Sequence, residues 1–181
     1  MNRQDALDLV QTHLKNKNLM KHSLSVEACM RAMAARLGGD PEVWGIAGLV
    51  HDMDYELTEK SPELHTVETV KILEGLGFDP AIVHAVQAHA GKAACANPMD
   101  WAIYSIDPLT GLIIAATLMH PAKKIKSIDL EFVKRRYKEK GFARGARREE
   151  IEKSANLGLG LDEFISICLL AMQGIDQDLG L

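Results

Sequence analysis

Cysteine and long apolar runs are scarce in this chain of 181 residues. Its three cysteines, Cys29, Cys95 and Cys168, are odd in number, far apart and outside any CxxC pair, which argues against a disulfide framework and a thiolate zinc site. The longest apolar stretch, 109–119, is too short to cross a bilayer, and the polar residues 1–5 do not resemble a signal peptide. We therefore expect a soluble, cytoplasmic protein without a membrane partner.

Aromatic residues and glycine-rich phosphate-binding motifs are also scarce. Aromatics make up only 5% of the chain and the formal charge is −4, which argues against nucleic acid as the main ligand because few stacking platforms are present. The one candidate glycine motif, Gly158-Leu159-Gly160, has no flanking strand pattern. A small phosphorylated molecule is the preferred partner, and a homo-oligomer remains open.

The charge is unevenly distributed along the chain. Residues 120–153 contain twelve Lys and Arg against six Asp and Glu, so this segment is basic and the remainder is acidic. Such a segment raises the local concentration of anions and could meet a phosphate-bearing ligand. The alternative is a solvated helix face.

No stretch of the chain alternates apolar and polar residues with a period of two, so the sequence predicts an all-α fold, a compact helical bundle. Apolar residues recur every three or four positions, and four helix starts are marked by a capping residue followed by proline: Asp40-Pro41, Ser61-Pro62, Asp79-Pro80 and Asn97-Pro98. The expected helices span 5–15, 19–37, 41–51, 62–76, 80–90, 98–107, 109–119, 129–140, 149–154 and 161–174.

Two histidines and two acids lie beside apolar helical faces in this pattern. They are His22, the pair His51-Asp52, and Asp107, where the following Pro108 predicts a kink or a helix end. Burying these polar groups together without a cation would be costly. Nitrogen and carboxylate ligands suit Zn, Mn, Fe, Co or Ni, and separate helices can bring them to one point in a bundle core.

The ordered set H…HD…D on helices resembles the HD-domain superfamily of metal-dependent phosphohydrolases. The resemblance covers about residues 19–120 and includes the surroundings His22-Ser23-Leu24-Ser25-Val26-Glu27 and Gly48-Leu49-Val50-His51-Asp52-Met53-Asp54. The whole chain is most similar to small, single-domain predicted hydrolases of that superfamily from bacteria. The resemblance implies one HD-type domain over 1–181, with basic and C-terminal helices at 121–181 following the metal-ligand core.

The resemblance also implies positions for a second metal ion. His65, in the first turn of the helix opened by Ser61-Pro62, is similar to one such ligand, although Thr69 stands where those families often have glycine. His89 shares a helix face with Ile82 and Val86 and is similar to the other ligand, whereas His84 lies about 140° away around the helix. The alternative for His65 and His89 is a capping or core role. One or two ions are therefore expected.

The remaining candidate residues follow from the chemistry of phosphate hydrolysis. A divalent ion lowers the pKa of bound water and polarises a phosphoryl oxygen, and Asp52 is best placed to bridge two ions. Proton transfer needs a nearby acid or base, and the candidates are Asp54, Glu56 and Glu27. Candidate phosphate-binding cations come from the basic segment: Lys123, Lys124, Lys126, Arg144, Arg147 and Arg148.

The leading hypothesis is therefore a metal-dependent hydrolase of a phosphate ester, with a nucleotide or another small phosphorylated metabolite as substrate. Two alternatives remain, because a fold does not fix chemistry. A six-residue ligand set of this kind is similar to that of HD-type di-iron oxygenases. The second alternative is a metal-stabilised binding module without catalysis, whose partner would contact the basic helix around Lys134-Arg135-Arg136.

Overall fold

The computed structural model describes residues 2–181, and this part of the chain is helical without a β-strand, as the sequence predicts. The elements follow one another as α1 (Arg3–His13), α2 (Lys17–Leu37), α3 (Pro41–Val50), α4 (Tyr55–Thr58), η1 (Pro62–Leu64), α5 (Val67–Gly75), α6 (Pro80–His89), α7 (Pro98–Met119), η2 (Ile125–Ser127), α8 (Leu130–Lys138), α9 (Arg148–Ile151), η3 (Glu152–Leu157), α10 (Leu161–Gln173) and α11 (Asp176–Leu179).

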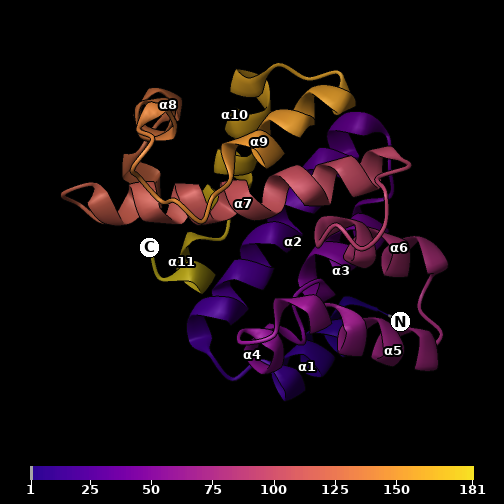
Figure 1. Cartoon of the computed structure of the whole chain (residues 1–181). Helices are drawn as coiled ribbons and strands as arrows, with labels where there is room; N and C mark the ends of the chain where they lie inside the picture. Colours follow the sequence, from indigo (N-terminus) through magenta and orange to yellow (C-terminus); the bar gives the residue numbers. More distant parts are fainter. Residues whose placement is uncertain (1) are drawn as a thin grey trace.

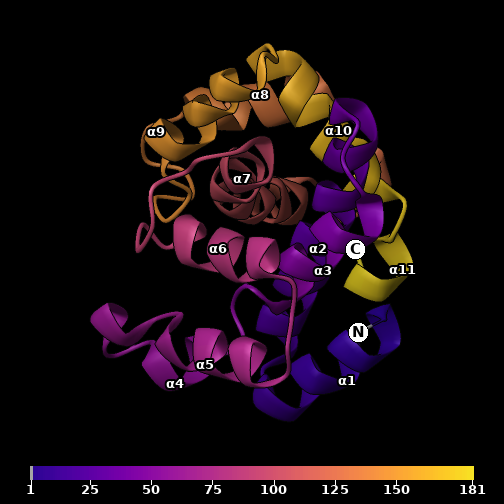
Figure 2. The same ribbon diagram turned by 90° about the vertical axis from the view of Figure 1, so that its right-hand side faces the viewer.

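Helix α7 runs through the centre of the bundle. Helices α8, α9 and α10 cover one side of it, and α2, α3 and α6 lie against the other (Figures 1 and 2). Its side chains Ile103, Ile106, Leu109 and Ile113 are fully buried. The stretch 109–119 is too short to cross a bilayer by itself, but it lies in the longer α7, which is long and apolar enough to do so by length and composition; 61% of the most apolar part of α7 is buried inside the fold.

Helix α3 packs closely on α2 because it presents glycine at the contact. A Cβ atom on Gly48 would lie 3.0 Å from the backbone N of Glu27 and 3.0 Å from the backbone C of Val26. The absent side chain lets the two backbones approach, and this contact sets the separation of His22, on α2, from His51, directly after α3. Gly48 therefore positions two of the predicted ligands.

The capped helix starts are confirmed at three of the four Pro-containing sites. The side chains of Asp40, Asp79 and Asn97 each accept a backbone N–H of the helix that they precede, and proline follows each of them. Proline suits this position because its fixed φ fits the first turn and its missing N–H has no partner there anyway. These caps set the starts of α3, which His51 follows directly, and of α6 and α7, which carry His89 and Asp107.

The fourth such site does not open the expected helix. Pro62 begins a single 3-10 turn, His65 is extended, Thr66 has a left-handed φ of 71°, and α5 starts only at Val67. The expected helix over 62–76 is thus wrong in its first turn, and so is the placement of His65 in that turn. The cause is a tertiary contact, because Asp54 Oδ1 accepts the backbone N–H of Thr66 and overrides local propensity.

The helix break expected near Pro108 is also different in the structure. The two predicted helices, 98–107 and 109–119, form one helix, and Pro108 lies inside it without ending it. Pro108 has no N–H to donate to the carbonyl one turn earlier, but burial of this helix on both sides keeps it continuous. Asp107 therefore projects from a continuous central helix.

Candidate metal centre

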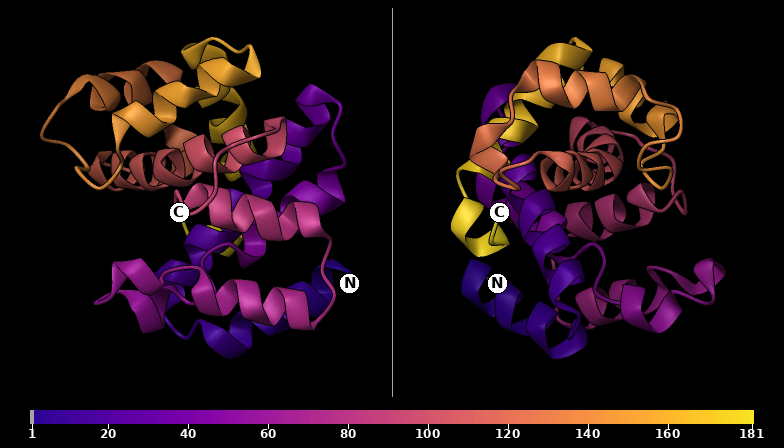
Figure 3. Two further views of the ribbon diagram at one scale, coloured as in Figure 1. Left: turned by 45° about the vertical axis from the view of Figure 1, so that its right-hand side comes forward. Right: turned by 90° about the vertical axis from the view of Figure 1, so that its left-hand side faces the viewer.

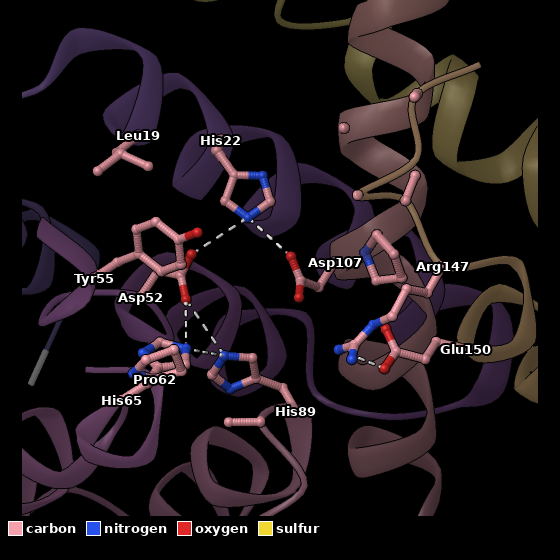
Figure 4. A pocket seen from close by; sticks show the side chains of 16 residues that line it. Leu19, His22, Asp52, Tyr55, Pro62, His65, His89, Asp107, Arg147 and Glu150 are labelled. Carbon is pink, nitrogen blue, oxygen red and sulfur yellow. Dashed lines mark hydrogen bonds and ion pairs between the residues drawn. The ribbon is translucent and has the colours of Figure 1, made fainter. Parts of the chain in front are cut away.

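The predicted ligands converge on one cavity of about 620 Å³. Figure 4 shows His22 and Asp107 at one end of the group and His65 and His89 at the other, with Asp52 between them. They come from α2, α7, the segment before α5, the end of α6 and the turn after α3. Residues 85 positions apart in the sequence thus meet at one point, as expected of a site in a bundle core.

The first group of ligand atoms faces one oxygen of Asp52. His22 Nε2 lies 3.0 Å from Asp107 Oδ1 and 3.6 Å from Asp52 Oδ2. His51 Nε2 lies 3.5 Å from the same Asp52 Oδ2 and 3.8 Å from Asp107 Oδ1. One ligand atom from each of His22, His51 and Asp107 lies within 4.8 Å of the others, which is close enough for all three to hold one ion.

The second group faces the other oxygen of Asp52. His65 Nε2 and His89 Nε2 lie 3.2 and 3.4 Å from Asp52 Oδ1, and 3.2 Å from each other. The two carboxylate oxygens of Asp52 therefore point to different histidine groups. This arrangement is the one needed for a carboxylate that bridges two cations.

Two of the histidines are oriented by their own helices. His51 Nδ1 lies 2.8 Å from the carbonyl oxygen of Gly48, and His89 Nδ1 lies 2.6 Å from that of Val86. A carbonyl can only accept, so each Nδ1 is the donor and Nε2 carries the free lone pair. Both rings therefore offer Nε2 to the cavity in the form that a metal ion requires.

The other two histidines are oriented by side chains. His22 Nδ1 lies 3.1 Å from Oγ1 of Thr110, and because the Thr110 hydroxyl donates its hydrogen to the carbonyl of Asp107, Nδ1 is the donor to Oγ1. His65 Nδ1 donates to Asp54 Oδ1 over 2.9 Å. Contacts of this kind fix ring orientation at metal sites. Asp54 also accepts the backbone N–H groups of Thr66 and Thr69, which holds the whole His65 segment in place.

The donor set fits a metal ion. Nε2 of His51 is fully buried and has no hydrogen-bond partner among the described residues. The Nε2 atoms of His65 and His89 face each other at 3.2 Å, where two neutral rings with Nδ1 protonated would repel through their lone pairs. Cations held by the two groups would give each of these nitrogens a partner, which explains why they point inward together.

Charge and burial perturb the ionisation of the group. Burial raises the pKa of Asp52, but the charge of His51 and hydrogen bonds from His65 and His89 outweigh it and hold this pKa well below its usual range. For His65, burial lowers the pKa, but hydrogen bonds to Asp52 and Asp54 raise it to about 9. The pKa of His89 is lowered, chiefly by burial. The centre is strongly anionic wherever its histidines are neutral, which favours a cation.

The three acids expected to transfer protons lie outside the cavity lining. Asp54 is buried and acts on His65, as described above. Glu56 accepts the backbone N–H groups of Lys15 and Asn16, and Glu27 is paired with Arg3 and Arg31. Asp54 thus positions a ligand, whereas Glu56 and Glu27 join α1 to the bundle.

The expected phosphate-binding cations divide into three sets. Lys123, Lys124 and Lys126 line no part of the cavity, and Lys126 is paired with Asp176. Arg148 donates its guanidinium N–H groups to five backbone carbonyl oxygens of 136–146, so it is committed to the loop. Arg147 lines the cavity, while Arg144 lies beside it in a neighbouring hollow.

The cavity is also lined by two residues, Glu150 and Tyr55, that the sequence analysis did not single out. Glu150 is mostly buried and pairs with Arg147, its Oε1 lying 2.6 Å from Nη2 (Figure 4). Burial raises the pKa of Glu150, and the charge of Asp107 adds to this effect against that of Arg147. Tyr55 lies at the other end of the cavity and packs edge-on against His65. The acidic helix start Arg148-Glu149-Glu150 gave no signal that one of its acids faces the site.

Comparisons with known proteins agree with this geometry. A family model described as "HD domain" matches residues 19–135. Proteins named Ribonuclease Y are similar to the chain. The one from Sulfurovum sp. (strain NBC37-1) is 27% identical, and the aligned region covers 74% of this chain and 27% of the relative. The one from Clostridium kluyveri is 26% identical, and the aligned region covers 83% of this chain and 26% of the relative. The chain spans about a quarter of the length of these curated relatives.

Proposed function

The chain belongs to the HD domain family, a family of metal-dependent phosphohydrolases, and from this premise we propose that it hydrolyses a small phosphate ester, such as a nucleotide. The observation that carries the proposal is the position of Asp52, with one oxygen toward His22 and His51 and the other toward His65 and His89. When bound there, one or two divalent transition-metal ions would supply an activated water molecule and neutralise charge on the phosphoryl group.

The residues that would hold the ions are those whose ligand atoms lie together. We assign His22, His51 and Asp107 to one group and His65 and His89 to the other, with Asp52 shared; the ligand atoms of His51, Asp52 and His89 also lie within 4.8 Å of one another, so His51 lies close to both groups. Asp54 keeps Nε2 of His65 directed at the second group by accepting from Nδ1. The nitrogen-rich set favours Zn, Mn, Fe, Co or Ni over Mg or Ca.

Arg147 supports a phosphate-bearing substrate. It lines the cavity and is directed by Glu150, and a guanidinium offers two parallel donors to phosphate oxygens. In our proposal Arg147 binds and orients the phosphoryl group. The relatives named Ribonuclease Y support phosphate-ester chemistry as well, since a ribonuclease cleaves phosphodiesters of RNA.

Glu150 is our candidate for proton transfer. The carboxylates that line the cavity are Asp52, Asp107 and Glu150, and the first two face the histidines. Glu150 remains as the carboxyl group whose pKa is raised, which suits a group that gives a proton to the leaving oxygen. Glu150→Gln should lower kcat and remove the corresponding limb of the pH–rate profile, whereas a role limited to holding Arg147 would raise KM alone.

The deciding experiment combines metal analysis with turnover. Elemental analysis of protein purified without added metal counts ions per chain, and the reconstituted protein is then incubated with phosphorylated metabolites and nucleotides. We expect phosphate release that EDTA abolishes. Iron together with oxygen uptake, and no phosphate release, would favour an oxygenase that uses the same six ligands. Metal without turnover of any kind would favour a binding module.

We propose that the protein acts in the cytoplasm.

A further inference from the structure

A second hollow opens beside the metal cavity. Its volume is about 570 Å³, and it shares Ala146 and Arg147 with the cavity, so the two spaces adjoin at these residues. Its lining comes from residues 137–149, the end of α8 and the loop that follows. This segment lies entirely after residue 135, where the match to the HD domain family ends. The hollow is therefore a feature of this chain's own C-terminal part.

The charges in the hollow are strongly unbalanced. Glu149 is the one acid among its lining residues. The cations are Lys138, Lys140, Arg144, Arg147 and Arg148, whose guanidinium is bound to loop carbonyl oxygens. Three of these cations, Lys138, Lys140 and Arg144, are exposed and form no ion pair with any described residue. A concave surface lined by unpaired cations attracts anions.

Two neighbouring cations on α8 differ from these three, because their charges are already paired. Lys134 is paired with Glu131 and Asp162, Arg136 with Glu139. Lys138, Lys140 and Arg144 thus keep their charge unpaired at the point where the chain turns toward the metal cavity.

The loop that carries these cations has a fixed shape. Figure 3 shows the segment between α8 and α9 leaving α8 and returning beside α7. The guanidinium of Arg148 lies inside this loop and donates to carbonyl oxygens at both ends of it, among them Arg136, Ala143 and Ala146. Ala143 adopts a left-handed φ of 45°, which an unrestrained alanine rarely does. The cations are therefore held by an ordered scaffold, which reduces the entropy lost on binding.

We propose that this hollow binds a second phosphate group of the substrate while the first lies at the metal centre. Arg147, on the shared wall, would lie between the two phosphates, and Lys138, Lys140 and Arg144 would hold the distal one. The substrate class is then a small nucleotide with at least two phosphate groups, such as a nucleoside bisphosphate or a dinucleotide. The assignment of the first phosphate rests on the proposed function, but the binding of the second does not.

Binding in EDTA tests the hollow without turnover. The probes are adenosine 3′,5′-bisphosphate and adenosine 5′-monophosphate, titrated into the full chain and into a Lys140→Gln/Arg144→Gln variant. We expect the double substitution to weaken bisphosphate binding by about tenfold, since it removes charge-assisted contacts to phosphate. A control, Lys17→Gln/Lys153→Gln, removes the same charge from exposed sites elsewhere and should change binding by less than about twofold.

Equal affinities for the chain and the Lys140→Gln/Arg144→Gln variant, or an equal loss in the control, would overturn the proposal. Circular dichroism of the variants shows that they fold, and the single substitutions replace the double one if it does not. With metal restored, KM for adenosine 3′,5′-bisphosphate should rise in the double variant more than KM for the monophosphate. Parallel assays with ADP and the dinucleotide pApA then identify the phosphate spacing.

Failure of this proposal and failure of the proposed function give different results. If no phosphate ester is hydrolysed with any metal, the proposed function fails, and the EDTA titration still decides whether the hollow binds the bisphosphate. If the monophosphate is hydrolysed and the titrations show no effect of Lys140→Gln/Arg144→Gln, the hydrolase proposal stands and the second phosphate site is rejected.

Discussion

The metal centre and the basic hollow lie side by side but are built in opposite ways. The ligands of the centre are buried or half-buried, and each histidine is oriented through its Nδ1 atom. The cations of the hollow are exposed, and a single guanidinium, that of Arg148, fixes the loop that carries them. The family match covers the first region and ends before the second. The histidine and aspartate ligands thus lie in the matched region, whereas the basic hollow lies in the part that follows it, from which Arg147 and Glu150 also reach the cavity.

The largest test of the comparison is Asp52→Asn. Asparagine removes the charge that both histidine groups face, so both ions should bind weakly and phosphate release should fall by about three orders of magnitude. Elemental analysis and a phosphate-release assay measure this. Asp8→Asn is the control, because the Asp8 carboxylate is exposed and accepts a hydrogen bond from Gln4 on α1. An active Asp52→Asn protein with full metal content would contradict the shared role of this residue.

Asp54→Asn separates a positioning residue from a surface acid. It weakens the acceptor of His65 Nδ1 and of two backbone N–H groups, so we expect a loss of about 10–100-fold in activity or metal affinity, mainly in the second group. Glu56→Gln is the matched control, because Glu56 is nearby in sequence but lies outside the cavity lining. If both substitutions have the same effect, the distinction drawn between them is wrong.

Arg148→Met tests whether the hollow has a scaffold of its own. Five carbonyl oxygens lose a donor, and the free energy of unfolding should fall by about 1–3 kcal/mol, while residues 139–147 exchange amide hydrogens faster. Metal content should not change. Arg144→Met, which removes an exposed charge from the same loop, is the control for stability. Loss of metal from the Arg148 variant would show that the two regions are not independent.

The smallest expected effect is on stability as a function of pH in the metal-free protein. The folded pKa of His65, about 9, is above its unfolded value of about 6.5. Its contribution is therefore fully present below pH 6.5 and is lost as the pH rises through 9, by about 1 kcal/mol after allowance for solvent. Chemical denaturation in EDTA at pH 6, 7.5 and 9 measures it. His65→Gln should remove this part of the slope, and an unchanged slope would exclude His65 as the cause.

The sequence could indicate which residues come together because most of the predicted ligands obey helix periodicity; that they bind metal stays a prediction. His22, His89 and Asp107 lie on helices whose apolar faces are readable, and the caps at Asp79 and Asn97 set the starts of the helices that carry His89 and Asp107. The all-α fold is confirmed for the same reason. The segment before α5 could not be predicted, because its path is set by Asp54, a contact between residues 11–15 positions apart that competes with local helix propensity.

The roles of the cations in the basic segment were harder to predict, because the spacing of charged residues in a loop does not indicate which way each side chain faces. Arg144, Arg147 and Arg148 look alike in the sequence, yet the structure gives them different surroundings: the hollow, the cavity wall and the interior of the loop. Which cation faces a ligand depends on the turn between α8 and α9, and that turn depends on carbonyl contacts that no pattern of side chains encodes. Glu150 was missed for the same reason.

The shared carboxylate of Asp52 has a thermodynamic consequence. Because its two oxygens belong to one rigid, singly charged group, occupation of one side changes the charge and orientation offered to the other. Linkage then requires that each ion alter the affinity of its neighbour by the same factor, whichever arrives first. A stepwise titration with zinc or manganese should therefore not fit two independent sites, and the coupling should vanish when the His65 side is disabled.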